Sequence, residues 1–585
     1  MDARAPAGGS EPFTTGLAGA KGWAIRAGAK AVMARVTDLV ESSHAFACAV
    51  LVLLSLAWFL PGFVSLQPMD RDEPRYAQAT KQMLETGDYV DIRFQDEARH
   101  KKPIGIYWLQ AASVKAADAL GLPAARTTIA AYRVPSLIGA IATVLLTYWA
   151  ALAFTSRRGA FMAAALMGAS VILLVEARLA KTDAALTACC VAAMGGLARA
   201  YLFRDDPMLP YRTTVFVWLA VAAGVLIKGP LLPIFVGLAA VTLAIRERSG
   251  RWLMRLRPKL GLLMVVALVA PWFVAISIKS GGAFYSASIG HDLAGKVGTA
   301  QTYHWAPPGF YLLSFFATFW PGAVLAAIAV PFAWINRRDD RVAFALAWIV
   351  PCWVLLEAVP TKLPHYVMPL YPAVAIVTVL AIAKGFVGPG RPGAKLAALL
   401  IPAIPVGLTV GLAVAGAMLD RAIPFAALPI LAGASLVAAG AYVMFRRGQI
   451  WGGAAAGILA SAVLALGVFG VGQTLLRSLK LSPRMAEVAK NVPCNDPAVA
   501  SLGYREPSLI FLVGTDLELL ESGREAAEFL RGGGCRVAFV ERRFDDAFRK
   551  EAERQSIRPA LSTRLSGFNI NNGRHLEIGA YYVTP

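Results

Sequence analysis

Long apolar segments follow one another along most of this chain, and they restrict its possible folds more than any other feature. The first runs from about Ala45 to Leu66. A helix of about 20 apolar residues crosses the hydrocarbon core of a bilayer, so this run is long enough to span a membrane. By this criterion the sequence predicts about thirteen spans. The others cover residues 131–154, 160–176, 184–203, 213–227, 230–245, 260–278, 309–334, 342–358, 366–383, 396–418, 424–445 and 452–476.

The overall composition agrees with a polytopic α-helical membrane protein. Of the 585 residues, 57% are hydrophobic and 16% are charged, whereas soluble domains have about 45–50% apolar and about 25% charged residues. A formal net charge of +20 would indicate nucleic-acid binding in a soluble chain. Here, basic cytoplasmic loops that face anionic lipid are a sufficient explanation. No P-loop, zinc-finger spacing or dinucleotide-binding motif is present, and no nucleic-acid partner is expected.

The distribution of lysine and arginine predicts which loops share a side of the membrane. If the basic N-terminal arm, residues 1–43, is cytoplasmic, every strongly basic short loop falls on the cytoplasmic side. The number of spans is then odd, and the C-terminal part lies outside. We therefore expect a membrane domain at residues 44–480, with long outer loops at 67–130 and 279–308. The aromatic residues of these two loops suggest amphipathic helices on the membrane surface, or simply an aromatic belt.

From residue 481 to residue 585 the composition changes, and a small outer α/β domain is predicted. Its strands are expected at Ser508–Gly514, Arg536–Glu541 and Ile578–Val583, and its helices at Leu517–Arg531 and Phe544–Gln555. Cys494 and Cys535 are the only cysteines in this part. Outside the cytoplasm a disulfide between them is plausible. The other cysteines, Cys48, Cys189, Cys190 and Cys352, lie in apolar segments.

Ionisable residues gather in the outer loops. Asp72, Glu73 and Arg75 follow the first span directly. Charges this dense beside a hydrocarbon boundary are costly unless they meet water or a charged ligand. An ordinary solvated loop is the alternative interpretation. The remaining outer clusters are Arg99–Lys102, Lys181–Asp183, Lys228–Pro230, the loop that carries His291, Lys296 and His304, and Lys362–Tyr366.

Several of these side chains have a chemical and a structural interpretation. Asp72 can act as a general base, orient an acceptor or bind a divalent ion, or it can simply pair with a neighbouring arginine. Asp183 can serve the same chemistry or cap a helix N-terminus. Lys228, beside Gly229 and Pro230, suits an anion site, or it can extend to the membrane interface.

Two carboxylates among many cations indicate a phosphate-bearing substrate at the membrane surface, because Arg and Lys neutralise phosphate and stabilise it as a leaving group. The histidine spacing matches no compact metal site. No cofactor is therefore required, although a divalent metal remains an option.

The order of these segments resembles the GT-C class of lipid-dependent glycosyltransferases. Within that class the sequence is similar to the 4-amino-4-deoxy-L-arabinose lipid A transferase family, which is related to the protein O-mannosyltransferases. The resemblance covers roughly residues 45–480, and the C-terminal domain fits the aminoarabinose subgroup better. The matching segments are Arg71–Tyr76, Lys102–Trp108, Lys181–Asp183, Ile227–Gly229, His291 with His304, and Lys362–Pro372.

This resemblance implies transfer of 4-amino-4-deoxy-L-arabinose, with inversion, from undecaprenyl phosphate to a phosphate of lipid A, at the periplasmic face of a bacterial inner membrane. Its implied partners are the undecaprenyl-phosphate-linked sugar, lipid A and membrane lipids. Asp72 and Asp183 would be the catalytic acids. The substrate- and phosphate-binding residues would be Arg75, Lys102, Lys228, Glu73, His291, His304, Lys362, His365 and Tyr366.

The sequence departs from this family at two positions, and other functions stay open. Lys101 stands where several relatives carry an acid, and Lys296 where relatives tend to carry an arginine. One alternative is a transferase to protein hydroxyls or to another glycan, in which Asp72 would be the base. Another is a transporter or flippase of a polyprenyl-linked sugar, although transporters place ionisable residues near the midplane and often contain repeats.

Overall fold

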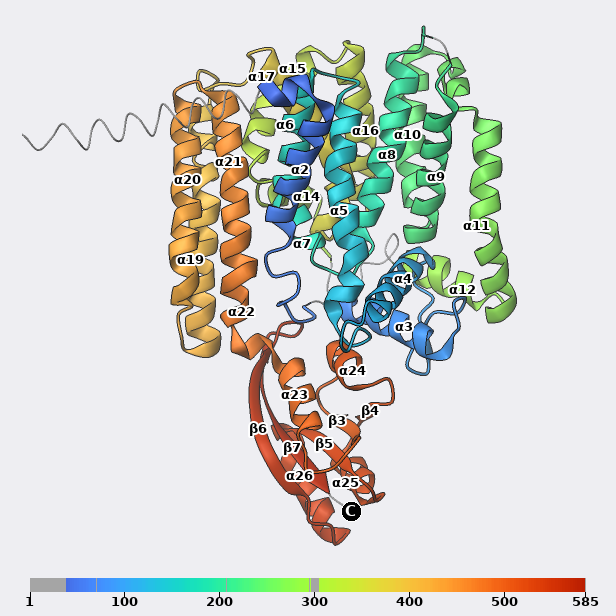
Figure 1. Cartoon of the computed structure of the whole chain (residues 1–585), viewed down its shortest axis with the longest axis vertical. Helices are drawn as coiled ribbons and strands as arrows, with labels where there is room; N and C mark the ends of the chain where they lie inside the picture. Colours follow the sequence, from blue (N-terminus) through green and yellow to red (C-terminus); the bar gives the residue numbers. More distant parts are fainter. Residues whose placement is uncertain (1–37, 70, 207, 294, 296–304, 584–585) are drawn as a thin grey trace, which may run out of the picture.

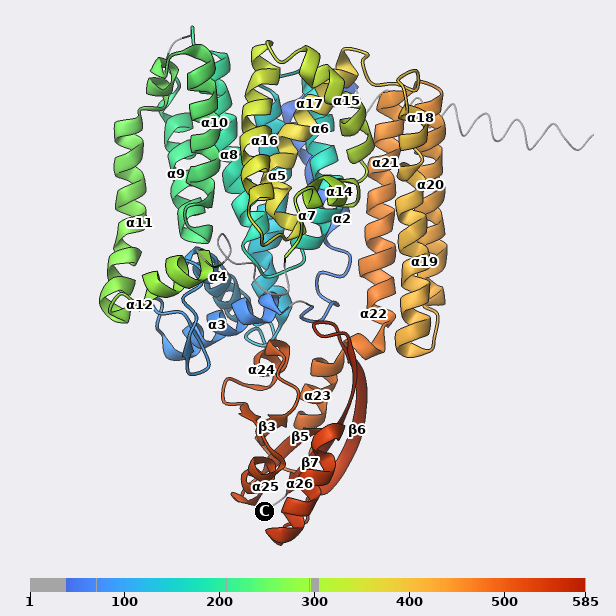
Figure 2. The same cartoon turned by 180° about the vertical axis from the view of Figure 1, so that it is seen from behind.

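The computed structural model describes residues 38–69, 71–206, 208–293, 295 and 305–583. Helices form a broad bundle, and a small α/β domain extends from one end of it (Figures 1 and 2). We call this end of the bundle the site face. The N-terminal arm up to residue 37 lies outside the described residues.

Each predicted apolar run corresponds to one, two or three consecutive helical elements of the bundle. Among the described residues, nine helices are long and apolar enough to cross a membrane, and α2 and α15 are shorter. The chain is therefore a multi-pass membrane protein. The bundle contains α2 (His44–Phe59), α5 (Ile129–Ala151), α6 (Arg157–Ala169), α7 (Val171–Glu176), α8 (Asp183–Leu202), α9 (Tyr211–Lys228), α10 (Leu231–Glu247), η1 (Arg251–Leu256), α11 (Pro258–Ser280), α14 (Phe310–Thr318), α15 (Ala323–Ile335), α16 (Asp340–Ala358), η3 (Pro364–Leu370), α17 (Tyr371–Ala383), α18 (Ala394–Ala397), α19 (Leu400–Asp420), η4 (Phe425–Ala427), α20 (Leu428–Arg446), α21 (Ile450–Ala465), η5 (Leu466–Gly472) and α22 (Gln473–Leu475).

Two of the predicted runs are interrupted helices. The run at 160–176 divides at Ser170, whose extended backbone (φ −62°, ψ 132°) ends α6 and precedes α7. The run at 309–334 divides between α14 and α15, where Pro321 follows Trp320. A residue before proline is disfavoured in the helical region, so a continuous helix is not expected there. The two interruptions meet in the interior, where the backbone N–H of Val171 donates to the carbonyl of Trp320 over 3.3 Å.

Short elements cover the site face. The first outer loop contains α3 (Asp72–Thr86), a small hairpin of β1 (Arg93–Phe94) and β2 (Glu97–Ala98), and α4 (Gly105–Ala119). The other long outer loop begins with α12 (Ala283–Tyr285) and η2 (Ser286–Leu293). Within the described residues, both loops thus contain helical segments. In Figure 1, α3, α4 and α12 lie at the same end of the bundle as the C-terminal domain.

The C-terminal domain is a five-stranded sheet with helices on both faces. Its strand order is β4-β3-β5-β7-β6; β4, β3 and β5 are parallel, and β7 is antiparallel to β5 and to β6. After η6 (Arg477–Leu479), the domain contains α23 (Leu481–Lys490), β3 (Ala498–Leu502), α24 (Pro507–Val513), β4 (Glu518–Leu520), α25 (Gly523–Arg531), β5 (Arg536–Glu541), α26 (Arg542–Arg554), β6 (Ala560–Asn569) and β7 (Arg574–Val583).

The alternation of side chains along β5 explains the two cores of this domain. Val537 and Phe539 pack on the side of α23 and α24, whereas Ala538 and Val540 pack on the side of α25 and α26. Successive residues of a strand point to opposite faces, so one apolar strand supplies both layers. The predicted strand at Arg536–Glu541 is confirmed, and the one predicted at Ile578–Val583 forms part of β7.

Of two other predictions for this domain, one was wrong and one was partly right. The run 508–514 belongs to α24, a buried helix, and not to a strand. The helix predicted at Leu517–Arg531 is present as α25 from Gly523, but its start is strand β4. A short apolar run without alternation fits a buried helix as well as a buried strand. The strands β3 and β6 were missed, because β3 is short and rich in alanine and β6 is largely exposed.

The predicted disulfide between Cys494 and Cys535 is present and closes a sequence separation of 41 residues. Loop closure of this length stabilises a domain by roughly 2–4 kcal/mol, mainly by restricting the unfolded chain. We expect Cys494→Ser with Cys535→Ser to lower the unfolding free energy of the C-terminal domain by that amount. Calorimetry of the purified protein, with and without reductant, measures the effect. The free cysteine Cys189 supplies the control Cys189→Ser, and a wild-type transition insensitive to reductant would contradict the prediction.

Candidate active site at the site face

A buried ion pair anchors the start of α3 to the bundle. Nε of Arg133 donates to Oε1 of Glu73 over 2.7 Å, and Nη2 donates to Oε2 over 3.0 Å; both side chains are fully buried. The remaining N–H groups of Arg133 donate to the carbonyls of Phe63, Leu66 and Gln67. Every guanidinium donor is thus used within the protein. This corrects the prediction that Glu73 binds substrate: protein groups enclose its carboxylate.

The same carboxylate holds the segment that leads into α8. Oε1 of Glu73 accepts a hydrogen bond from the backbone N–H of Ala180 over 3.0 Å. The amide of Gln110 on α4 donates to the carbonyl of Ala180 (3.1 Å), and the hydroxyl of Ser136 on α5 donates to the carbonyl of Lys181 (3.1 Å). Three elements thereby fix the backbone immediately before the first residue of α8.

Two glycines allow the surrounding helices to approach closely. A Cβ on Gly139 of α5 would lie 2.7 Å from the backbone of Ala185 on α8. A Cβ on Gly105 of α4 would lie 2.8 Å from the backbone of Leu226 on α9. Any side chain at these positions would push the helices apart. The close packing places the first residue of α8 near the last residue of α9.

Those two residues, Asp183 and Lys228, form the centre of a buried charge network. The ammonium of Lys228 pairs with Oδ1 of Asp183, and Nε2 of His365 lies 3.7 Å from the same oxygen. Nδ1 of His365 lies 3.4 Å from Oε1 of Glu176, and Nζ of Lys181 lies 3.4 Å from that oxygen. None of these side chains is more than 13% exposed. Two carboxylates thus share two lysines and an imidazole.

The structure brings together three residues that the sequence placed on one face, namely Asp183, Lys228 and His365. The sequence interpretation missed Glu176, which ends the apolar helix α7. A carboxylate at the end of a membrane span is costly unless it is paired, and this was the available signal. Asp183 is also the first residue of α8, so its charge favours the helix N-terminus as well.

Asp72 and Arg75 lie in the first turn of α3, further from the bundle. Oδ1 of Asp72 lies 3.8 Å from Nη1 of Arg75, and the side chain of Asp72 is 53% exposed. Burial raises the pKa of Tyr76 well above its usual value, and the negative charges of Asp72 and Asp183 contribute to the increase. Tyr76 is therefore close to both predicted catalytic acids.

A cavity of about 410 Å³ lies beside this network, and three lysines are among the residues that line it. Lys101 and Lys102 come from the segment before α4, and Lys228 comes from the end of α9. We call this space the lysine cavity. Its other walls are mostly apolar and comprise Pro103, Val225, Gly229, Pro230, Pro233, Phe273, Phe284, Tyr285 and Ser288. An apolar pocket with a few converging charges is typical of a ligand site.

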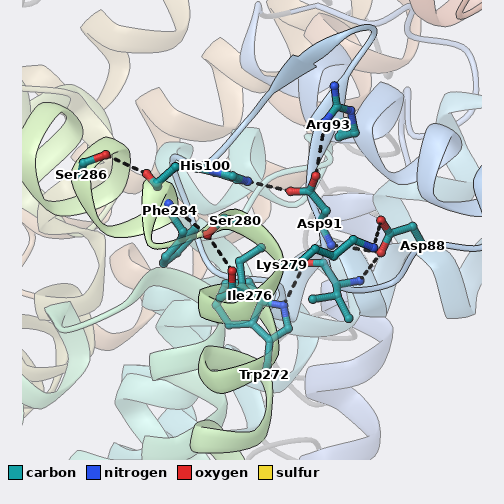
Figure 3. Close-up of polar contacts among 12 residues, drawn as sticks. Asp88, Asp91, Arg93, His100, Trp272, Ile276, Lys279, Ser280, Phe284 and Ser286 are labelled. Carbon is teal, nitrogen blue, oxygen red and sulfur yellow. Dashed lines mark hydrogen bonds and ion pairs between the residues drawn. The ribbon is translucent and has the colours of Figure 1, made fainter.

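Figure 3 shows the polar contacts between the first outer loop and α11–α12; Phe284, one of the residues drawn, also lines the lysine cavity. Lys279 pairs with Asp88, and Nε1 of Trp272 donates to a backbone carbonyl of the loop over 3.2 Å. The ring of His100 packs edge-on against Phe284, with centroids 5.7 Å apart. Burial tends to raise the pKa of Asp88, but hydrogen bonds from Lys279 and the backbone outweigh burial and lower it. The loop thus stays attached to the outermost helix of the bundle.

The remaining predicted residues are placed as follows. Nζ of Lys362 donates to the carbonyl of Val359 over 2.7 Å, and the ring of Tyr366 lies 5.2 Å from Nζ of Lys228. His304 lies outside the described residues, and of His291 only the backbone in η2 is described. Among the described residues, no three His, Cys, Asp or Glu side chains are grouped to hold a metal ion.

The membrane bundle, the covering helices of the site face and the C-terminal α/β domain together form a GT-C glycosyltransferase fold. The particular fold is that of ArnT from Cupriavidus metallidurans. Its structure bound to undecaprenyl phosphate matches with a TM-score of 0.69 and 17% sequence identity, over 92% of this chain and 98% of that chain. Its apo structure matches with a TM-score of 0.68, over 91% and 97% of the two chains.

Curated proteins of similar sequence carry the name undecaprenyl phosphate-alpha-4-amino-4-deoxy-L-arabinose arabinosyl transferase. The protein from Aeromonas hydrophila subsp. hydrophila is 28% identical over 340 residues, which are 54% of this chain and 58% of that protein. The protein from Pectobacterium carotovorum subsp. carotovorum is 27% identical over 335 residues, or 56% and 57%. The chain thus spans little more than half the length of the curated relatives it matches. No family model matches it.

Proposed function

We propose that this protein is an inverting glycosyltransferase that moves 4-amino-4-deoxy-L-arabinose from undecaprenyl phosphate to a phosphate of lipid A. The reaction would take place at the periplasmic face of a bacterial inner membrane. The names of the similar proteins and the shared fold with ArnT support this proposal. The observation that carries it is the lysine cavity, where Lys101, Lys102 and Lys228 converge beside Asp183.

The proposed reaction exchanges one phosphate for another at the anomeric carbon of the sugar. An oxygen of the acceptor phosphate attacks this carbon from the face opposite the lipid phosphate, and the bond to the lipid phosphate breaks with its electron pair. The departing undecaprenyl phosphate gains negative charge, which the lysine cavity stabilises. Because a phosphate acceptor is already ionised near pH 7, no base is needed. We therefore assign Asp72 to orienting the acceptor or the amine of the sugar.

A reconstituted assay with the purified protein, lipid-linked aminoarabinose and lipid A tests this function. Mass spectrometry should detect lipid A with one added aminoarabinose. Transfer to protein hydroxyls or to another glycan would instead establish the first alternative, with Asp72 as the base. Movement of the lipid-linked sugar across vesicles without any new glycosidic bond would establish a transporter.

Lys102→Ala is expected to weaken binding of undecaprenyl phosphate by roughly 10- to 100-fold, because hydrogen bonds to charged groups contribute about 1.5–3 kcal/mol. Titration of the purified protein with undecaprenyl phosphate, followed by tryptophan fluorescence, measures the affinity. Lys115→Ala is the matched control, since Lys115 is exposed on α4, outside the lysine cavity. Equal affinities of the Lys102→Ala variant and the wild type would exclude a phosphate contact by Lys102.

A further inference from the structure

Arg99 is a buried arginine whose guanidinium lies beside two tyrosine rings. The residue is 8% exposed, and among the described residues no carboxylate lies within ion-pair distance of it. Its guanidinium lies 5.1 Å from the centroid of the Tyr76 ring and beside the phenol of Tyr107. Its Nε is buried without a hydrogen-bond partner. These contacts leave much of the guanidinium available to an anion.

Three other arginines are buried among the described residues, and each donates to several protein groups. Arg255 donates to the carbonyls of Arg199, Ala200 and Phe203. Arg133 uses all of its donors on Glu73 and on backbone carbonyls. Arg178 donates to the carbonyls of Pro61, Leu174 and Trp58. A buried charge without such partners is expensive, and an aromatic ring offsets only part of the cost. An anionic ligand that bound the guanidinium would offset this cost of burying the charge.

A second arginine faces the same space. Burial lowers the pKa of Arg75, and the positive charge of Arg99 is the next largest cause of that decrease. The two guanidiniums are thus close enough to repel each other. Asp72 lies 3.8 Å from Arg75, and its side chain is half-exposed, so solvent and solutes reach this pair. Two neighbouring arginine forks are well suited to a phosphate group.

We propose that Arg99, together with Arg75, binds the phosphate of the acceptor at a second anion subsite, separate from the lysine cavity. This inference rests on the proposed function, in which one sugar passes between two phosphates. The two phosphates need two positions. The lysine cavity provides one, and Arg99 is not among the residues that line it. Arg99 lies instead on the side of Tyr76 and Asp72, where an acceptor would meet the sugar.

Arg99→Met tests this assignment in the full-length protein. We expect the KM for lipid A to rise roughly 10- to 100-fold, since a charge-assisted fork is lost, while the affinity for undecaprenyl phosphate changes less than about twofold. Arg99→Lys keeps the charge but not the fork, so its KM for lipid A should lie between those of wild type and Arg99→Met. Arg93→Met is the matched control, because Arg93 is exposed on the neighbouring hairpin.

A binding experiment separates this subsite from the sugar-transfer reaction itself. With undecaprenyl phosphate present at saturation, pyrophosphate should raise the unfolding temperature of the wild type and of Arg93→Met, but not of Arg99→Met. This result is expected even if the wild type transfers no sugar to lipid A, an outcome that would refute the proposed function alone. Comparing lipid A with free pyrophosphate shows whether the lipid or only its phosphate is recognised.

The proposal is overturned if Arg99→Met leaves the KM for lipid A unchanged, or if the affinity for undecaprenyl phosphate falls in parallel with that for lipid A. A purely structural role for Arg99 would lower the unfolding temperature without this selective loss of acceptor binding. If Arg99→Met is not recovered as folded protein, Arg99→Gln carries the same test, because it removes the charge and keeps a polar side chain.

Discussion

Asp183→Asn is expected to lower the rate of sugar transfer by about 10²- to 10⁴-fold. The carboxylate of Asp183 pairs with Lys228 and lies 3.7 Å from His365. A neutral amide would remove the counter-charge of Lys228, and its ammonium would no longer be held at the edge of the lysine cavity. Initial rates at saturating donor and acceptor, with equal amounts of folded protein, measure the loss.

Asp118→Asn is the control for this substitution. This substitution is the same chemical change, made on α4 at the site face. The side chain of Asp118 is 56% exposed, and its Oδ2 lies 3.9 Å from Nη2 of Arg126. Exposed pairs of this kind contribute about 0–1 kcal/mol, so rate and stability should stay near wild type. A wild-type rate for Asp183→Asn would remove Asp183 from the catalytic site.

Glu73→Gln is expected to lower the free energy of unfolding by about 3–5 kcal/mol, because it leaves the buried charge of Arg133 without its counter-ion. Both side chains are fully buried, so water cannot replace the lost carboxylate. The backbone N–H of Ala180 also loses a charged acceptor, which loosens the entry to α8. Thermal unfolding of the purified protein in detergent measures the change.

Glu97→Gln, on the exposed strand β2, should leave the unfolding temperature unchanged and serves as the control for Glu73→Gln. The two substitutions are chemically identical and differ in burial. If Glu73→Gln unfolded at the wild-type temperature but lost donor or acceptor binding, Glu73 would return to the set of substrate-binding residues.

Much of the membrane bundle could be predicted from the sequence, because an apolar run in lipid depends little on its neighbours. Its backbone N–H and C=O groups find no water to bond with, so they must hydrogen-bond within the segment, as in a helix. The disulfide between Cys494 and Cys535 was predictable for a similar reason, since no other cysteine lies outside the apolar segments.

The C-terminal domain was harder to predict, because its segments depend on their neighbours. The run 508–514 is apolar without alternation and became helix α24 rather than a strand. Phe511 of that helix packs edge-on against Tyr132 of α5, with ring centroids 5.2 Å apart. Nζ of Lys81 donates to the carbonyl of Phe511 over 3.3 Å. This contact with the bundle is absent from any local pattern.

The site could be predicted only in part, because its side-chain partners come from different segments of the chain. The sequence placed Asp183, Lys228 and His365 on one side of the membrane, and the structure joins them in one network. It did not reveal that Glu176 lies next to the same histidine, or that Arg99 lies over the ring of Tyr76. Such pairings depend on how helices pack, and residue type alone does not specify them.

Hydropathy and charge in the sequence alone determined that this chain crosses a membrane many times and that its polar clusters gather at one end. Only the tertiary structure decided the role of each charge. Glu73 and Asp72 are neighbours in one motif, yet Glu73 meets Arg133, 60 positions away, in the interior while Asp72 remains half-exposed. The reason is physical: membrane insertion depends on each segment by itself, whereas the partner of a charge depends on contacts between segments far apart in the chain.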